Sequence, residues 1–249
     1  MSLKFKEEDI KKLILEKKRV FGDLGESVVV FEKAILRGNT ICDCLIFSRK
    51  KGIIGVEIKT ERDTTRRLNK QLRDYSRVCD YVYVLCHDNH VGKVSNILSR
   101  YKHQHVGIIS YTEWKGEPML GRYKDAASSP DKSAFQMMDM LWKTEIVHSL
   151  GAFKHYGRYI QEEYGVRVKE DPHWVKGGGA NSALANHNPY GSKTRKSSLI
   201  VTLIKKLGGE QEATRFVCDL FIRGDMDPGK SLKYYHFLLP ENRGPYESR

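Results

Sequence analysis

The sequence predicts an α/β protein in which helices flank a mixed sheet on both sides and a helical region follows. Three strand patterns come in succession, at residues 27–32, 40–47 and 53–60. Helical and strand patterns then alternate as far as residue 111, and beyond about residue 113 the apolar periodicity is helical. The resulting order, α-β-β-β-α-β-α-β, requires both antiparallel and parallel neighbours within one sheet.

An amphipathic helix is expected at residues 4–19, because Ile10, Leu13 and Ile14 lie on one side of a charged segment. The three strand segments that follow are joined by the short connections R-G-N and S-R-K-K-G. Connections of this length favour antiparallel neighbours, so we expect a meander.

The next helix is predicted by the spacing of Leu68, Leu72 and Tyr75, with Asp63 or Thr64 as a candidate N-terminal cap. The apolar run YVYVLC that follows is typical of a strand buried on both faces. The same reasoning predicts a helix at 91–101, a strand at 106–111, and helices at 135–150, 153–164, 194–207 and 210–223.

The change of pattern predicts two domains, an α/β core at residues 1–112 and a mainly helical region at 113–249. Within the second region, residues 171–193 contain a glycine triplet with several Asn and Pro residues. This composition is typical of a loop or linker.

The charge and the apolar content of the chain limit the classes of partner and the compartment that we expect. Lys and Arg number 43 against 31 Asp and Glu, a net charge of +12 that favours a polyanionic partner such as nucleic acid. No run of 18 apolar residues occurs, and the N-terminal segment MSLKFKEEDIKKL is charged where a signal peptide is apolar. We therefore expect a cytoplasmic protein with no membrane partner. The five cysteines contain no C-x-x-C pair, which favours reduced, buried thiols.

Charged residues interrupt the apolar strand IIGVEIKT at residues 53–60. Glu57 and Lys59 share one face with Gly55, because side chains alternate along a strand. Asp43 interrupts the preceding strand, and pairing of the two strands would bring it toward Glu57. Two neighbouring carboxylates repel unless a cation lies between them, so the pattern predicts a site for Mg²⁺ or Mn²⁺. The structural alternative is that Asp43 caps a turn or pairs with Lys59.

These residues resemble the PD-(D/E)XK nuclease superfamily, in which an acidic strand residue precedes E-x-K on the next strand and a helix carries Gln. The segment EIKTERDTTRRLNKQLRDY is similar to a bacterial and phage group with the signature E-I-K-[ST]-x-x-D-T-x-x-R-L-x-x-Q-x-x-x-Y. Cys42 stands where the superfamily name has Pro. The positions that match the signature are Glu57, Ile58, Lys59, Thr60, Asp63, Thr64, Arg67, Leu68, Gln71 and Tyr75.

The resemblance implies a restriction-endonuclease-like α-β-β-β-α-β core and a set of site residues. Asp43, Glu57 and the main-chain carbonyl of Ile58 would hold Mg²⁺ or Mn²⁺. Lys59 would orient the attacking water or stabilise developing charge, and Gln71 would position the substrate. Together with Asp43, Glu57 and Lys59, Gln71 is therefore predicted to be catalytic.

Additional contacts are less defined by the pattern. A further acidic ligand could come from Glu26 or Glu32, and the sequence leaves both open. Basic residues around the predicted helix and after the Gly- and Asn-rich segment are candidates for contacts to substrate phosphates. These candidates are Arg66, Arg67, Lys70, Lys193 and Arg195.

The function expected from this resemblance is metal-dependent hydrolysis of phosphodiester bonds, with DNA favoured as the substrate. One alternative is an RNA-directed nuclease that uses the same site. Another is a nucleic-acid-binding or inhibitor protein that retains the fold and cuts nothing. The sequence leaves open whether cleavage is internal or terminal, what structure is recognised, and how many copies assemble.

Overall fold

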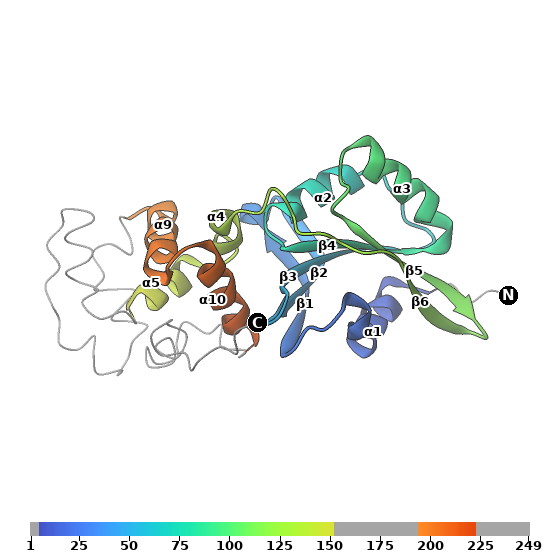
Figure 1. Cartoon of the computed structure of the whole chain (residues 1–249), viewed down its shortest axis with the longest axis horizontal. Helices are drawn as coiled ribbons and strands as arrows, with labels where there is room; N and C mark the ends of the chain where they lie inside the picture. Colours follow the sequence, from blue (N-terminus) through green and yellow to red (C-terminus); the bar gives the residue numbers. More distant parts are fainter. Residues whose placement is uncertain (1–4, 152–193, 223–249) are drawn as a thin grey trace, which may run out of the picture. The chain divides into compact units, whose positions relative to one another are not determined.

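A computed structural model describes residues 5–151 and 194–222 (Figure 1). The chain divides into two compact units, Met1–Met140 and Leu141–Arg249, and each is described by itself. The helix predicted at 153–164, the loop predicted at 171–193 and the candidate residue Lys193 lie outside the described ranges.

The first unit contains a six-stranded mixed sheet whose spatial order follows the chain. The first three strands form the predicted antiparallel meander, the next two neighbours are parallel, and the final pair is antiparallel. The predicted α/β class is confirmed. The strands are β1 (Ser27–Ile35), β2 (Thr40–Ser48), β3 (Gly52–Lys59), β4 (Tyr81–His87), β5 (Gly107–Trp114) and β6 (Glu117–Lys124).

Helices cover both faces of this sheet, as Figure 1 shows. The parallel neighbours β3, β4 and β5 need crossover connections, which α2 (Leu68–Ser76) and α3 (Val91–Arg100) supply. These two helices contact each other on one face, and α1 (Glu7–Glu16) lies on the opposite face against β3. A short 3-10 helix, η1 (Lys18–Phe21), follows α1.

The two faces of β3 differ in chemistry. Toward α1, its side chains join a buried apolar cluster that includes Ile10 and Ile14 of the helix. Toward α2 lies Gly55, where an added Cβ would be 2.8 Å from Cys79 Sγ and 3.0 Å from a ring carbon of Tyr75. Glycine therefore lets α2 approach β3 closely. The β3 members of the apolar cluster are Ile54, Val56 and Ile58.

The last strand, β6, was not predicted, and the expectation that only helices follow residue 113 is wrong. Lys115 and Gly116 both have positive φ, 52° and 83°, and they form the two-residue turn that joins β5 to β6. Because β6 is an edge strand with mostly exposed side chains, it lacks the apolar alternation that marks a half-buried strand. The strand-forming part of the chain thus extends beyond residue 112.

The helix predicted at 135–150 is divided into α4 (Ala134–Met138) and α5 (Lys143–Gly151). The Glu145 carboxylate accepts a hydrogen bond from the Trp142 backbone at 2.5 Å, which caps the start of α5. A side chain three residues into a helix that bonds back to its first backbone donor stabilises a helix start. Apolar periodicity continues across this break and so does not reveal it.

The start of α2 is also later than predicted. The Asp63 carboxylate accepts from both the backbone and the hydroxyl of Thr60 at 2.7 Å, so it closes a turn at the end of β3 and does not cap the helix. The helix begins five residues later, at Leu68.

In the second unit, α9 (Lys196–Leu207) packs against both α5 and α10 (Glu210–Ile222). Gly208, with φ of 97°, ends α9 in the left-handed conformation that favours glycine. The predictions of helices at 194–207 and 210–223 are confirmed.

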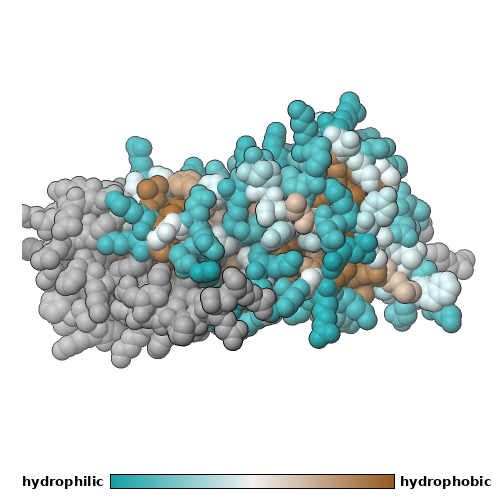
Figure 2. Space-filling model, viewed as in Figure 1, coloured by the Kyte–Doolittle hydropathy of each residue, from teal (hydrophilic) through white to brown (hydrophobic). Residues whose placement is uncertain are grey.

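Three further findings concern the described residues as a whole. None of the described helices combines the length and the apolar character needed to cross a bilayer. All five cysteines are free and buried, as predicted. Figure 2 shows hydrophilic side chains over most of the visible described surface, with smaller apolar areas between them.

Candidate active site

Glu57 and Lys59 lie on the α2 face of β3, as the alternation of side chains predicts. Both are buried, and Lys59 Nζ lies 2.5 Å from Glu57 Oε1. Withdrawing both charges from water costs free energy, which their mutual attraction only partly offsets. A buried pair of this kind is therefore weak support for stability alone and directs attention to function.

Tyr75 of α2 connects this pair to β2. Its hydroxyl donates to Glu57 Oε2 at 2.6 Å and accepts from the backbone N–H of Asp43 at 2.9 Å. Burial raises the pKa of Tyr75 strongly, so the phenol stays neutral and keeps its proton for Glu57. The sequence marked Tyr75 only as an apolar helix position and a signature match. Its spacing of four residues from Gln71, one helical turn, was the available signal.

Asp43 lies at the point where regular pairing between β2 and β3 ends. The last paired residues are Cys44 and Val56, and beyond them Asp43 Oδ2 accepts a hydrogen bond from the backbone of Ile58 at 2.8 Å. The pKa of Asp43 is raised to about 7, chiefly by burial and then by the charge of Glu57, while the Ile58 N–H and Lys59 act in the opposite direction. Asp43 and Glu57 therefore act on one another as neighbouring negative charges.

Gln71 lies one helical turn before Tyr75 and is half-buried. Among the described residues, no hydrogen-bond partner reaches its buried side-chain oxygen Oε1. Buried acceptors are nearly always satisfied in folded proteins, so an unpaired one indicates a missing donor or cation. The Gln71 carbonyl is thus available to a ligand on the α2 side of the sheet.

The donor set fits a hard divalent cation such as Mg²⁺ or Mn²⁺. Asp43, Glu57 and the Ile58 carbonyl offer oxygen ligands, and a cation would offset the burial and the repulsion from Glu57 that raise the pKa of Asp43. Over the ranges 5–151 and 194–222, no cluster of three or more His, Cys, Asp or Glu residues is arranged to hold a metal. Two carboxylates with water as the remaining ligands suit Mg²⁺, which keeps much of its hydration.

Neither of the two candidate additional acids joins this group. Glu26 pairs with Arg49 at 2.6 Å, and Glu32 pairs with Lys11 at 2.6 Å. Each carboxylate is thus already bound to a basic side chain.

The predicted phosphate-binding residues are only partly brought together. Arg66 and Arg67 are exposed immediately before α2. Lys70, on the first turn of α2, pairs with Asp74 at 2.8 Å and contacts Thr40 Oγ1 at 3.0 Å.

Arg195 is exposed at the N-terminal cap of α9, in the second unit. The contact of Arg66, Arg67, Lys70 and Arg195 with substrate phosphates stays a prediction.

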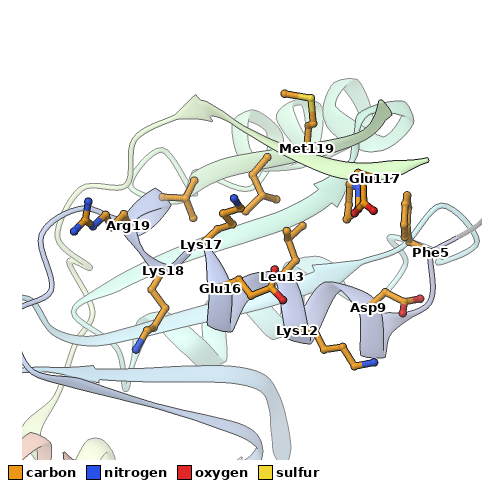
Figure 3. A pocket seen from close by; sticks show the side chains of 13 residues that line it. Phe5, Asp9, Lys12, Leu13, Glu16, Lys17, Lys18, Arg19, Glu117 and Met119 are labelled. Atoms are coloured by element: carbon orange, nitrogen blue, oxygen red, sulfur yellow. The ribbon is translucent and has the colours of Figure 1, made fainter. Parts of the chain in front are cut away.

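A separate groove of about 970 Å³ lies between the α1–η1 segment and β6 (Figure 3). Leu13 of the helix and Met119 of the strand line it, with basic residues such as Lys17 and Arg19 along the helical side. None of the predicted site residues lines this groove. Its mixture of apolar and oppositely charged residues indicates no particular ligand.

The fold and site describe an α/β protein in which a buried glutamate and lysine lie between sheet and helix, beside a half-buried aspartate. The family model described as Bacteriophage P4 protein cII matches residues 1–170, and the chain belongs to this family. This assignment makes the chain a phage-related protein. Comparison with curated proteins and with solved structures gives no match.

Proposed function

We propose that this protein is a metal-dependent nuclease of the PD-(D/E)XK type that hydrolyses phosphodiester bonds, with DNA as the favoured substrate. The observation that carries the proposal is the convergence of Asp43, Glu57 and Lys59. All three lie at the end of regular pairing between β2 and β3, and the pKa of Asp43 is raised by burial and by Glu57.

The arrangement of elements supports the proposal independently of these side chains. A helix, three antiparallel strands, a crossover helix and a parallel fourth strand follow in the order that the PD-(D/E)XK resemblance implies. Fold alone does not assign an activity, so the argument depends on the side chains gathered at this position.

In the proposed reaction, Asp43, Glu57 and the Ile58 carbonyl would hold Mg²⁺ or Mn²⁺. The ion would act as a Lewis acid that activates water and neutralises charge on the phosphoryl oxygens. The Lys59 ammonium would orient the water or stabilise the developing charge from the same face of β3. The unpaired Gln71 carbonyl would accept a hydrogen bond from substrate or from an ordered water.

The charge of the chain supports a nucleic-acid substrate. The excess of 12 positive charges attracts a polyanion, and exposed Arg66 and Arg67 lie just before α2, which also carries Gln71 and Tyr75. This electrostatic term does not distinguish DNA from RNA, so an RNA-directed nuclease remains within the same proposal.

A protein that binds nucleic acid without cutting it is the second candidate, and one observation favours it. Both carboxylate oxygens of Glu57 are already engaged, Oε1 by Lys59 and Oε2 by Tyr75. Metal binding through Glu57 requires at least one of these contacts to lengthen. A protein that binds nucleic acid without cutting it would keep both contacts.

The deciding experiment is incubation of the protein with single-stranded, double-stranded and branched DNA and with RNA, with and without Mg²⁺ or Mn²⁺. We expect cleavage that depends on metal and is lost in the variants Asp43→Asn and Lys59→Met. The control is Asp125→Asn, which changes an exposed aspartate paired with Arg122. Metal-independent cleavage, or equal cleavage by the Asp43 variant, would contradict the proposed site.

A search for binding separates the two candidates. Calorimetric titration with Mn²⁺ should give heat with the wild-type protein and none with Asp43→Asn. Nucleic-acid binding without metal uptake or cleavage on any substrate would favour the second candidate.

A further inference from the structure

We propose a second nucleic-acid contact, a subsite for a backbone phosphate in the pocket between the η2 turn, α2 and α4. This inference rests on the proposed function, because it adds a position for the same substrate. The pocket has a volume of about 500 Å³, and η2 spans Leu36–Gly38. Its basic lining residues are Arg37, Lys70 and Arg77.

Buried acids hold two of the bases in place. Arg37 Nε lies 3.1 Å from Asp139 Oδ2, and the Arg37 side chain is 69% exposed while that of Asp139 is 3% exposed. The buried carboxylate of Asp139 therefore fixes the position of the guanidinium, and the rest of the guanidinium remains exposed to solvent. Arginine presents several donors in a fixed plane, which suits phosphate oxygens.

Lys70 is held in the same manner. Its Nζ lies 2.8 Å from Asp74 Oδ2, with the lysine side chain 54% exposed and the aspartate 8% exposed. Thr40 donates its hydroxyl proton to the same Asp74 oxygen at 2.5 Å, which fixes the carboxylate. Arg37 and Lys70 are thus already held in place by buried acids. Binding an anion therefore costs little additional side-chain entropy.

Arg77 supplies the uncompensated charge. It is exposed, and within the described ranges it makes no ion pair with a carboxylate. The three bases and the two acids Asp74 and Asp139 leave a formal charge of +1 in the pocket. An anion of one negative charge, such as a phosphodiester, matches this balance.

Backbone strain at the turn is a second, independent observation. Leu36 and Arg37 both have positive φ, 49° and 60°, which is unfavourable for residues with side chains. Burial of Leu36 holds the strained turn in place. Strain of this kind persists where the surrounding structure enforces it and is concentrated at ligand-binding sites.

The subsite lies within reach of the proposed active site. Thr40, which fixes Asp74, is three residues before Asp43 on β2, a separation of roughly 10 Å at the rise of a strand. Lys70 and Gln71 are consecutive on α2. A single nucleic-acid strand can therefore contact the pocket and the carboxylate pair together, so we assign the pocket to a phosphate near the one that is cleaved.

The test is the salt dependence of binding to a single-stranded DNA oligonucleotide, measured by fluorescence anisotropy in EDTA so that no cleavage occurs. Each phosphate contact that is lost lowers the slope of log K against log salt by about 0.7 for a single strand. We expect Arg37→Gln with Arg77→Gln to weaken binding several-fold and to reduce this slope by roughly 0.7, the value for one phosphate.

Matched controls make the test specific. Lys102→Gln with Lys115→Gln removes the same charge from exposed positions that do not line the pocket, and it should leave the slope near the wild-type value. Arg37→Lys with Arg77→Lys keeps the charge and should restore the slope. If loss of the Asp139 pair prevents folding, Arg77→Gln alone should still lower the slope, by up to about 0.7.

A slope unchanged in the pocket variants, or lowered equally in the controls, would overturn the subsite. This outcome is distinct from failure of the proposed function, which the cleavage assay with wild-type protein decides. If the wild-type protein cuts, pocket variants should raise KM and leave kcat largely unchanged, because the pocket binds substrate away from the reacting atoms. A fall in kcat with unchanged KM would place these residues elsewhere in the mechanism.

Discussion

Two clusters of lysine and carboxylates occupy the two faces of the same sheet, and their electrostatics are opposite. Toward α1, Lys11 contacts Glu7 at 3.0 Å, Glu8 at 3.2 Å and Glu32 at 2.6 Å. Toward α2, Lys59 forms an ion pair with Glu57, and Asp43 is the second acid nearby.

The difference lies in which partner is buried. In the α1 cluster the base is buried and the acids remain 48 to 74% exposed, so water still solvates their charge. The pKa of Lys11 is raised, chiefly by its hydrogen bond with Glu32, and the pKa of Glu32 is lowered by the same lysine. Lys11 and Glu32 are thus both stabilised in their charged forms.

In the α2 cluster the acid Glu57 is fully buried, and the pKa of Asp43 is raised to about 7. The ionised form of Asp43 is therefore disfavoured in the fold at neutral pH. The charges of the α1 cluster are already balanced within the cluster. In the α2 cluster, a bound cation would stabilise the ionised form of Asp43. This contrast supports placing the proposed site at the α2 cluster.

The largest effect is expected for Glu57→Ala, which leaves Lys59 buried without its partner. Breaking a buried ion pair by removing one member costs about 3 to 5 kcal/mol of unfolding free energy. Urea denaturation measures this loss. The double variant Glu57→Ala with Lys59→Met should recover part of it, and a single variant as stable as the wild type would show that the pair is solvated.

Asp43→Asn should change the free energy of unfolding in the opposite direction and stabilise the protein at pH 8. Because the pKa of Asp43 rises from 3.8 to about 7 on folding, the folded state holds the proton more tightly. The free energy of unfolding of the wild type therefore falls by up to about 4 kcal/mol as pH rises from about 4 to 7. Above pH 7 it levels off.

The pH dependence of stability in Asp43→Asn tests the contrast between the two clusters further. Denaturation at several pH values should show this decline in the wild type and its absence in Asp43→Asn. Addition of Mn²⁺ at pH 8 should raise the melting temperature of the wild type but not of the variant. A variant less stable than the wild type at pH 8 would mean that the repulsion is already compensated.

Tyr75→Phe should have an intermediate effect. It removes the donor to Glu57 and the acceptor for the Asp43 backbone, and leaving such buried groups unpaired costs about 1 to 3 kcal/mol. Tyr123→Phe is the control, because Tyr123 is 64% exposed. Equal melting temperatures for both variants would show that water replaces the hydroxyl.

Lys11→Met should have the smallest effect of the four. The apolar stem is retained, and the released acids are exposed enough to be solvated. Thermal melting at low and at high salt measures the change, which should fade as salt screens the pairs. A loss as large as that of Glu57→Ala would remove the distinction between the two clusters.

Parts of the site were predictable because they depend on local geometry. Alternation along a strand placed Glu57 and Lys59 on one face, and the short connection between β2 and β3 brought Asp43 beside them. Other contacts were not predictable from pattern. The Tyr75 bridge requires α2 to pack closely over Gly55, a distance that periodicity does not encode.

The edge strand and the pocket between η2, α2 and α4 show the same limit of sequence reasoning. An exposed strand such as β6 needs no apolar alternation, because only one neighbour supports it. The pocket joins Arg37, Lys70 and Asp139, which are far apart in the sequence and meet only through packing of η2, α2 and α4.

By itself, the sequence determined the α/β class, the antiparallel meander and the charged face of β3, and it carries the signature that resembles the PD-(D/E)XK group. These features follow from backbone periodicity and short connections, which act over a few residues. Only the tertiary structure decided that the two faces carry clusters of opposite electrostatic character, because burial and contacts between distant residues set the cost of each charge.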